Sequence, residues 1–234
     1  MFHLAQTNYY YMKLILNNFL ILLLFICKPV YSENIKKEFA IKTSGIKIGV
    51  LIWEIKIDDF SYTNNLRLES GGLLSAIYKF KGEYFSEGII INNKLISNRY
   101  NHIWKTKKIE KTMNLEFNNN KLSLLDQTPY EKENLRVDIF KIKGSKDPLS
   151  SFLEIVMGKN NSLVVDGRRI YTMNAKPNNK DNKTVIEISD YSNLWADHKR
   201  SKFEQISFER KDGFLLPIKI NISFDGRVFK LEQN

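Results

Sequence analysis

The chain has 234 residues, with 36 Lys or Arg, 26 Asp or Glu and a single Cys. This length is enough for one well-packed core, and one cysteine excludes a fold held together by disulfides. The basic excess consists of lysines scattered singly along the chain, which argues against the clustered footprint of a nucleic-acid-binding protein.

The first 32 residues have the pattern of an export signal, with Met12 as an alternative start. An apolar run extends from Phe19 to Cys27, and Val30 and Ser32 stand at the recognition positions of a cleavage site. This run is shorter than the ~20 residues that span a bilayer, so we expect cleavage after Ser32 and a periplasmic product. Counted from Leu14, the segment also fits an uncleaved inner-membrane anchor, which stays the alternative.

Cleavage would remove Cys27, so the remaining chain has no thiol nucleophile. It would also remove Lys13 and Lys28, which leaves 34 basic against 26 acidic residues and a net charge of +8. For an exported chain, the expected anionic partner is a lipid or an envelope polysaccharide and not nucleic acid. Membrane association would be peripheral or through the uncleaved leader.

Residues 33–234 are expected to form one β-domain, because apolar and polar residues alternate with period two. A change of phase near Leu51 predicts a bulge or a strong twist inside the long strand that begins near Ile46. The spacing of turn signals predicts about ten strands in an antiparallel meander. The turn signals are Asp58-Asp59, Asn92-Asn93, Asn118-Asn119-Asn120, Asp166-Gly167, Asp212-Gly213 and Asp225-Gly226.

Two segments depart from this alternation. In SGGLLSAIYKFKG the apolar residues Leu73, Leu74, Ile77 and Tyr78 have helical spacing. The second segment is predicted as a helix over about 147–157, with Asp147 as its N-cap, Pro148 at the first helical position and Gly158 as its stop. Its apolar face has Leu149, Phe152, Leu153, Val156 and Met157, and its polar face has Ser150, Ser151 and Glu154.

The apolar face of this second helix needs a partner, and the concave side of a curled sheet is the nearest surface that could cover it. We therefore expect an all-β protein: a strongly curved antiparallel meander sheet, or open half-barrel, with one short helix packed in its concavity. The helix is expected to act first as a plug.

Four motifs occur in order: SGGLLSAIYKFKGEYFSEGII, DPLSSFLEIV, LVVDGRRIYTM and LLPIKINISFDGRVFKLE. This set resembles the exported bacterial proteins of the domain-of-unknown-function 3108 family, over about Ala40 to Leu231. The resemblance implies a cell-envelope protein with a predominantly antiparallel curved sheet. It implies no reaction, ligand or catalytic residue.

The sequence offers little for catalysis. Outside the leader the only histidines are His102 and His198, and no Gly-x-Ser-x-Gly elbow surrounds Ser150 or Ser151. Two histidines without cysteines, and without a spacing typical of zinc ligands, predict no metal site. We expect no cofactor and no enzymatic activity, and an envelope hydrolase ranks last among the hypotheses.

Arg168 and Arg169 follow the Asp166-Gly167 turn, so their side chains should project to opposite faces of the returning strand. The inward one should either pair with an acid, Asp166 or Glu187, or hold an anionic ligand group. Together with the aromatic residues Tyr171 and Trp195, they form the predicted ligand-binding set.

The resulting functional hypothesis is a non-catalytic periplasmic cell-envelope protein. It would bind a hydrophobic or amphipathic molecule, such as a lipid, an acyl chain or a glycan, in a groove of the curved sheet. The alternative is an envelope scaffold whose concavity is completely filled. An open apolar cleft of ~300 Å³ or more beside the helix would favour the first hypothesis, and a sealed core there would favour the scaffold.

Overall fold

The computed structural model describes residues 33–72, 75, 79–178, 182–195 and 203–234. The chain divides into two units, Met1–Tyr31 and Ser32–Asn234, and all the described strands and helices belong to the second unit. The predicted leader and the predicted helical stretch at Leu73, Leu74, Ile77 and Tyr78 lie outside the described residues.

The first half of the domain is an antiparallel meander of long strands. Each strand pairs with the next one along the chain. The strands are β1 (Glu33–Thr43), β2 (Ile46–Ile57), β3 (Ser61–Ser70), β4 (Phe80–Ile91), β5 (Lys94–Thr106), β6 (Glu110–Phe117) and β7 (Leu122–Thr128).

The second half begins after the short 3-10 helix η1 (Ile139–Lys141), with β8 (Ser145–Lys146) and the helix α3 (Pro148–Val156). It then continues as a second meander, in which the β8–β9 pair is the only parallel one among the described strands. Its remaining strands are β9 (Asn161–Val165), β10 (Arg169–Asn178), β11 (Lys183–Asn193), β12 (Phe203–Glu209), β13 (Lys219–Phe224) and β14 (Arg227–Gln233).

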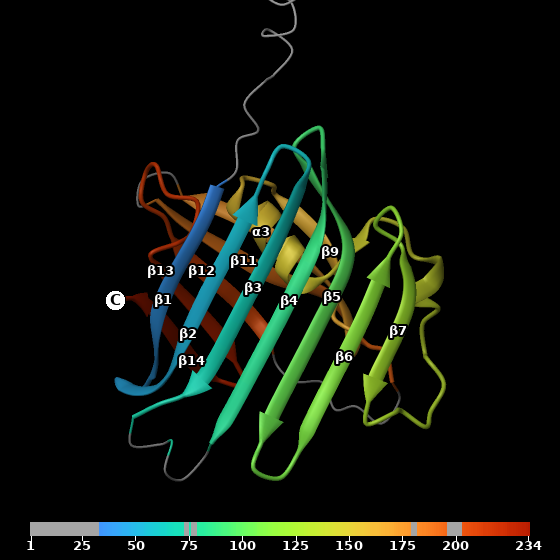
Figure 1. Ribbon diagram of the computed structural model, residues 1–234, viewed down its shortest axis with the longest axis horizontal. Coiled ribbons are helices and arrows are strands. Elements are labelled where there is room, and N and C mark those ends of the chain that lie inside the picture. Colours follow the sequence, from blue (N-terminus) through green and yellow to red (C-terminus); the bar gives the residue numbers. More distant parts are fainter. Residues whose placement is uncertain (1–32, 73–74, 76–78, 179–181, 196–202) are drawn as a thin grey trace, which may run out of the picture. The chain divides into compact units, whose positions relative to one another are not determined.

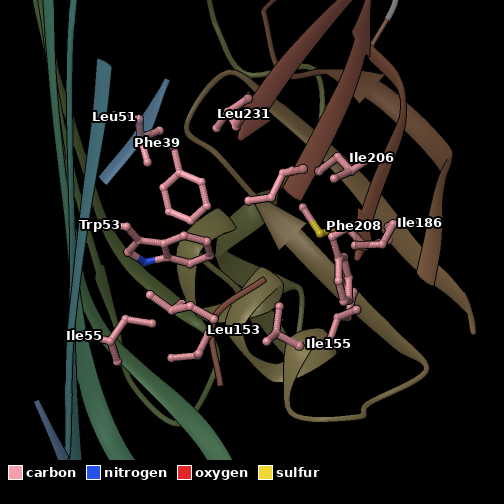
Figure 2. Packing of buried hydrophobic residues seen from close by; sticks show 14 of the residues in the cluster. Phe39, Leu51, Trp53, Ile55, Leu153, Ile155, Ile186, Ile206, Phe208 and Leu231 are labelled. Atoms are coloured by element: carbon pink, nitrogen blue, oxygen red, sulfur yellow. The ribbon is translucent and has the colours of Figure 1, made fainter. Parts of the chain in front are cut away.

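The first strand pairs with the last, with Phe39 opposite Gln233, so both meanders belong to one 14-stranded sheet. The two halves of this sheet face each other, and α3 lies between them (Figure 1). Apolar side chains from β1 and β2, from the opposing strands and from the helix meet in one core (Figure 2). The expected curved antiparallel sheet with one enclosed helix is confirmed, with fourteen strands among the described residues instead of about ten.

The tight turns follow from residues that tolerate a positive φ. Asn92 and Asn93 have φ values of 50° and 60° between β4 and β5, as the Asn-Asn signal predicted. The strands on either side of Asp212-Gly213, β12 and β13, pair antiparallel as predicted, but their connection is longer than a two-residue turn. The predicted bulge lies a few residues before Leu51. In the β1–β2 pair, Ile41 stands opposite Gly49 and Lys42 opposite Lys47, so Ile48 is the extra, bulged residue on β2.

Helix α3 matches its prediction closely in length. Asp147 caps it by accepting hydrogen bonds of 2.9 Å from the backbone N–H groups of Leu149 and Ser150, and Pro148 is the first helical residue. Met157 is the C-cap residue and is exposed, so it does not belong to the buried apolar face.

The polar face of α3 differs from the prediction. Ser150, Ser151 and Glu154 are as buried as the apolar residues Leu153 and Val156. The sheet encloses the helix from more than one side, so strands pack against its polar face as well. Enclosed polar groups require hydrogen-bond partners, and the structure provides them.

Candidate functional site: a basic cleft at the end of the sheet

The polar side of α3 is anchored by a buried hydrogen-bond network. One carboxylate oxygen of Asp147 accepts hydrogen bonds from the hydroxyls of Ser86 (3.0 Å), Ser97 (2.8 Å) and Ser150. The Ser150 hydroxyl lies 2.6 Å from the hydroxyl of Tyr62 on β3. Burial raises the pKa of Asp147, while the hydrogen bonds from the serines oppose that shift.

All five members of this network are buried, and the hydrogen bonds from the three serine hydroxyls and the two backbone N–H groups satisfy the carboxylate. A satisfied polar network that solvent cannot reach is a structural anchor. It fixes the N-terminus of α3 to β4 and β5. We therefore assign it to the fold and not to a ligand.

The residues predicted to bind a ligand gather around the Asp166-Gly167 turn. Tyr171 and Trp195 are buried, and the indole N–H of Trp195 donates to the backbone oxygen of Gly167 over 3.3 Å. The guanidinium of Arg169 lies 3.7 Å from the Asp166 carboxylate and also stacks over Tyr191, with 5.9 Å between the guanidinium carbon and the ring centre.

Arg169 thus has the acidic partner that the sequence offered as one of two alternatives. The other alternative, Glu187, pairs with Lys176 at 2.6 Å. Arg168 is half-buried, and its positive charge contributes to the lowered pKa of His102. A ligand role for Arg168, Arg169, Tyr171 and Trp195 remains a prediction.

His102 lies on the inner face of β5, where its ring stacks on that of Tyr84 with 4.3 Å between the centroids. Burial and the charge of Arg168 lower its pKa to about 4. Within the described part of the chain its Nε2 has no hydrogen-bond partner. The serine hydroxyls that bond to a buried carboxylate, those of Ser86, Ser97 and Ser150, bond to Asp147 and not to this histidine. His198 lies outside the described residues.

One further row of residues crosses the inner face towards the end of the sheet where β4 begins. Leu68, Gly82, Trp104 and Lys111 stand opposite one another on β3, β4, β5 and β6. Trp104 has the same strand parity as His102 and the buried Tyr100, so it faces inwards. A side chain at Gly82 would crowd it, because an added Cβ would lie 3.2 Å from the Trp104 ring.

A cleft of about 480 Å³ opens beside Trp104. The Trp104 ring is supported by Phe80, which stacks on it with 5.3 Å between centroids and 11° between the planes. The exposed Ile109 supplies a second apolar wall. The remaining lining residues are Lys79, Thr106, Lys107, Lys108 and Lys111.

The cleft is therefore an aromatic and aliphatic floor rimmed by positive charge. A neighbouring cleft of about 370 Å³ shares Lys79, Thr106 and Lys107 with it and adds Lys81 and Lys105. Lys81 and Lys105 are neutralised by Glu83 and Glu110, each over 2.6 Å. Among the described residues, no ion pair within 4 Å involves the four lysines that line the larger cleft, Lys79, Lys107, Lys108 and Lys111.

Sequence reasoning missed this cleft because it treated the lysines as singly scattered. The signal was present in WKTKKIEK, residues 104–111, where four lysines and one glutamate flank Trp104 and Ile109. What the sequence could not show is that Lys79 and Phe80, about 25 residues earlier, lie beside this segment. The β4–β5 register places them there, with Phe80 opposite Thr106.

Among the described residues, no group of three or more His, Cys, Asp and Glu side chains is arranged to hold a metal ion. In the same part of the chain, no helix has the length and apolar character needed to cross a membrane.

No family profile matches the chain, and neither does any curated protein. Among solved structures, it is similar to the crystal structure of a β-barrel-like protein of the domain of unknown function DUF1849 from Brucella abortus. The two share 11% sequence identity over 88% of this chain and 96% of that chain, with a TM-score of 0.47. The resemblance to the 3108 family stays a prediction.

Proposed function

We propose that this chain is an exported, non-catalytic protein of the cell envelope that binds an anionic amphiphile in the basic cleft. The observation that carries the proposal is the cleft itself, with Trp104 and Ile109 as an apolar floor beneath Lys79, Lys107, Lys108 and Lys111. The N-terminal signal pattern supports export, and the periplasm is the compartment we propose.

The chemistry of the cleft favours a ligand with two parts. Its volume of about 480 Å³ lies within the range typical of small-molecule sites. Lysine side chains lay their aliphatic stems along apolar surface and keep the ammonium group in water. An acyl or other apolar group would therefore contact Trp104 and Ile109, while a phosphate or carboxylate would meet the lysines.

The space beside the helix is filled, and this favours a scaffold over a carrier that holds its ligand in an internal groove. Leu153, Ile155 and Val156 are buried against the sheet, and the two lysine-lined clefts lie at its end instead. A scaffold would use the same exposed surface to contact a protein or polymer and would not bind an acyl chain there.

Binding of dodecyl phosphate to the full chain, measured by isothermal titration calorimetry below the micellar concentration, tests the proposal. Dodecyl maltoside and inorganic phosphate serve as probes of the apolar and the charged part alone. We expect dodecyl phosphate to bind at least about tenfold more tightly than either, because only it satisfies both parts of the site. Equal affinity for all three probes would contradict the proposal and favour the scaffold.

The matched variants keep the net charge equal. Lys107→Glu combined with Lys108→Glu should weaken dodecyl phosphate binding by about tenfold or more. Lys132→Glu combined with Lys143→Glu changes the charge by the same amount at exposed positions outside the cleft and should leave binding unchanged. Similar losses in both double variants would show that only net charge matters.

A further inference from the structure

The end of the sheet opposite the basic cleft presents an apolar tip, which consists of Phe60, Ile89 and Ile91. Phe60 is 70% exposed, and both isoleucines are exposed as well. The three residues come from neighbouring strand ends: Ser61 stands opposite Ile89, and the N–H of Ile90 donates to the backbone oxygen of Phe60 over 2.7 Å. Single exposed apolar residues are common, but three on adjacent strand ends form a patch.

The turn before β3 holds Phe60 outwards. The Asp58 carboxylate accepts hydrogen bonds from the backbone N–H groups of Phe60 (2.8 Å) and Ser61 (2.6 Å) and from the Ser61 hydroxyl (2.7 Å). These bonds lower the pKa of Asp58, so its carboxylate stays ionised and bonded at neutral pH. The backbone at Phe60 is thus ordered before any contact forms, which reduces the entropy cost of burying the ring.

The predicted leader joins the domain at this same end. Glu33, the first residue of β1, stands opposite Ile57, three residues before Phe60. Only five residues, 28–32, separate the apolar run that ends at Cys27 from Glu33. Fully extended, this connection spans roughly 20 Å. An apolar run that stays in a bilayer would therefore keep the apolar tip close to the bilayer surface.

From these observations we propose that the apolar tip is a membrane-docking surface, and that Phe60 and Ile91 enter the interfacial layer of the lipid bilayer. Aromatic and aliphatic side chains on strand ends are suited to that layer, where one end of the group is apolar and the surroundings are partly hydrated. Lys94, exposed near the tip, would face lipid phosphates.

The apolar tip and the basic cleft cannot contact one flat bilayer together. Phe80 begins β4 at the cleft and Ile91 ends it at the tip, a strand of 12 residues. At about 3.3 Å per residue the two ends lie roughly 35 Å apart. Docking through the tip would leave the cleft facing away from that membrane, so the two proposals succeed or fail separately.

Depth measurements on the full chain in vesicles of phosphatidylethanolamine and phosphatidylglycerol test the docking proposal. In a Cys27→Ser background, single variants Phe60→Cys, Ile91→Cys and Ile46→Cys are labelled with a nitrobenzoxadiazole fluorophore. Ile46 is the matched control, because it is apolar, 57% exposed and lies at the far end of β2. All three variants retain the same leader.

We expect labels at positions 60 and 91 to shift to shorter emission wavelength and to be quenched severalfold more by acyl-chain spin-labelled lipids than the label at position 46. Equal quenching at positions 46 and 60 would overturn the proposal. Each labelled protein is also titrated with dodecyl phosphate. This titration distinguishes a failure of membrane docking from a failure of amphiphile binding in the basic cleft.

Discussion

Glu154 of α3 and Lys146 of β8 form an ion pair inside the protein, with side chains that are 4% and 3% exposed. The same carboxylate accepts a hydrogen bond of 3.0 Å from the backbone N–H of Leu95 on β5, and Lys159 pairs with its second oxygen at 2.7 Å. Glu154 therefore connects the helix to strands from both halves of the sheet. Burial lowers the pKa of Lys146, and the pairing with Glu154 opposes that shift.

Glu154→Gln should destabilise the protein by about 3–5 kcal/mol, because it leaves the Lys146 ammonium group buried without its counter-charge. Urea unfolding monitored by circular dichroism measures the change. Glu83→Gln is the control, since it removes a partner from the exposed Lys81 pair. A solvated pair contributes about 0–1 kcal/mol, and equal effects of the two substitutions would contradict the buried role.

His102 should make stability depend on pH. Its pKa falls from 6.5 to about 4 on folding, through burial and the charge of Arg168. Between these two values the unfolded chain binds a proton that the folded chain does not bind. The free energy of unfolding should therefore decrease as the pH falls from about 6.5 to about 4, by at most about 3 kcal/mol.

His102→Phe isolates this contribution, because it keeps an aromatic ring against Tyr84 and removes the titrating group. Urea unfolding of both proteins at several pH values between 4 and 7 gives the difference. We expect the native chain to lose more stability than the variant over this range. Parallel stability curves would show that His102 titrates alike in both states.

Gly88→Ala should destabilise the domain at the point where β4 passes Tyr62. An added Cβ would lie 2.0 Å from the backbone oxygen of Ile96 and 2.7 Å from the Tyr62 hydroxyl. The strand must shift, and the hydrogen bond between Tyr62 and Ser150 would be disturbed. The expected loss is about 1–3 kcal/mol.

Gly71→Ala is the control for this substitution, because the nearest atom to its added Cβ is 3.5 Å away, an ordinary contact. Its unfolding free energy should change by less than about 0.5 kcal/mol. The Gly88 prediction fails if both variants melt at the same temperature.

Phe152→Ala should cost about 3–4 kcal/mol, because the ring bridges the two halves of the sheet. Its centroid lies 5.6 Å from that of Trp53 on β2 and 5.7 Å from that of Phe208 on β12. Met157→Ala, at the exposed end of the same helix, should have little effect. A thermal melt of each variant checks the ranking, and unchanged melting of Phe152→Ala would refute its role in the core.

Much of the local structure could be predicted. The Asp147 cap, the Pro148 start and the Asn92-Asn93 turn were predicted correctly because each depends on a few consecutive residues. The curved sheet with one enclosed helix followed from period-two alternation and one well-capped helical segment. The strand count was low, because long polar connections and the two-residue strand β8 leave little trace in the alternation.

The candidate site was harder to predict. The lysines of WKTKKIEK were visible, but the pairing of Phe80 with Trp104 depends on the β4–β5 register, which no single segment specifies. The burial of Ser150 and Glu154 was missed for a similar reason. A helical pattern shows which face is apolar, and it does not show whether a second wall covers the other face.

The sequence by itself determined the elements: where strands alternate, where turns take a positive φ, and where one capped helix begins and ends. These are properties of neighbouring residues, and short-range sterics and hydrogen bonding decide them. Only the tertiary structure decided that β1 pairs with β14, that Asp147 accepts hydrogen bonds from serine hydroxyls on β4 and β5, and that lysines from three strand ends surround Trp104. Those contacts join residues far apart in the chain, and they exist only once the sheet has curled around its helix.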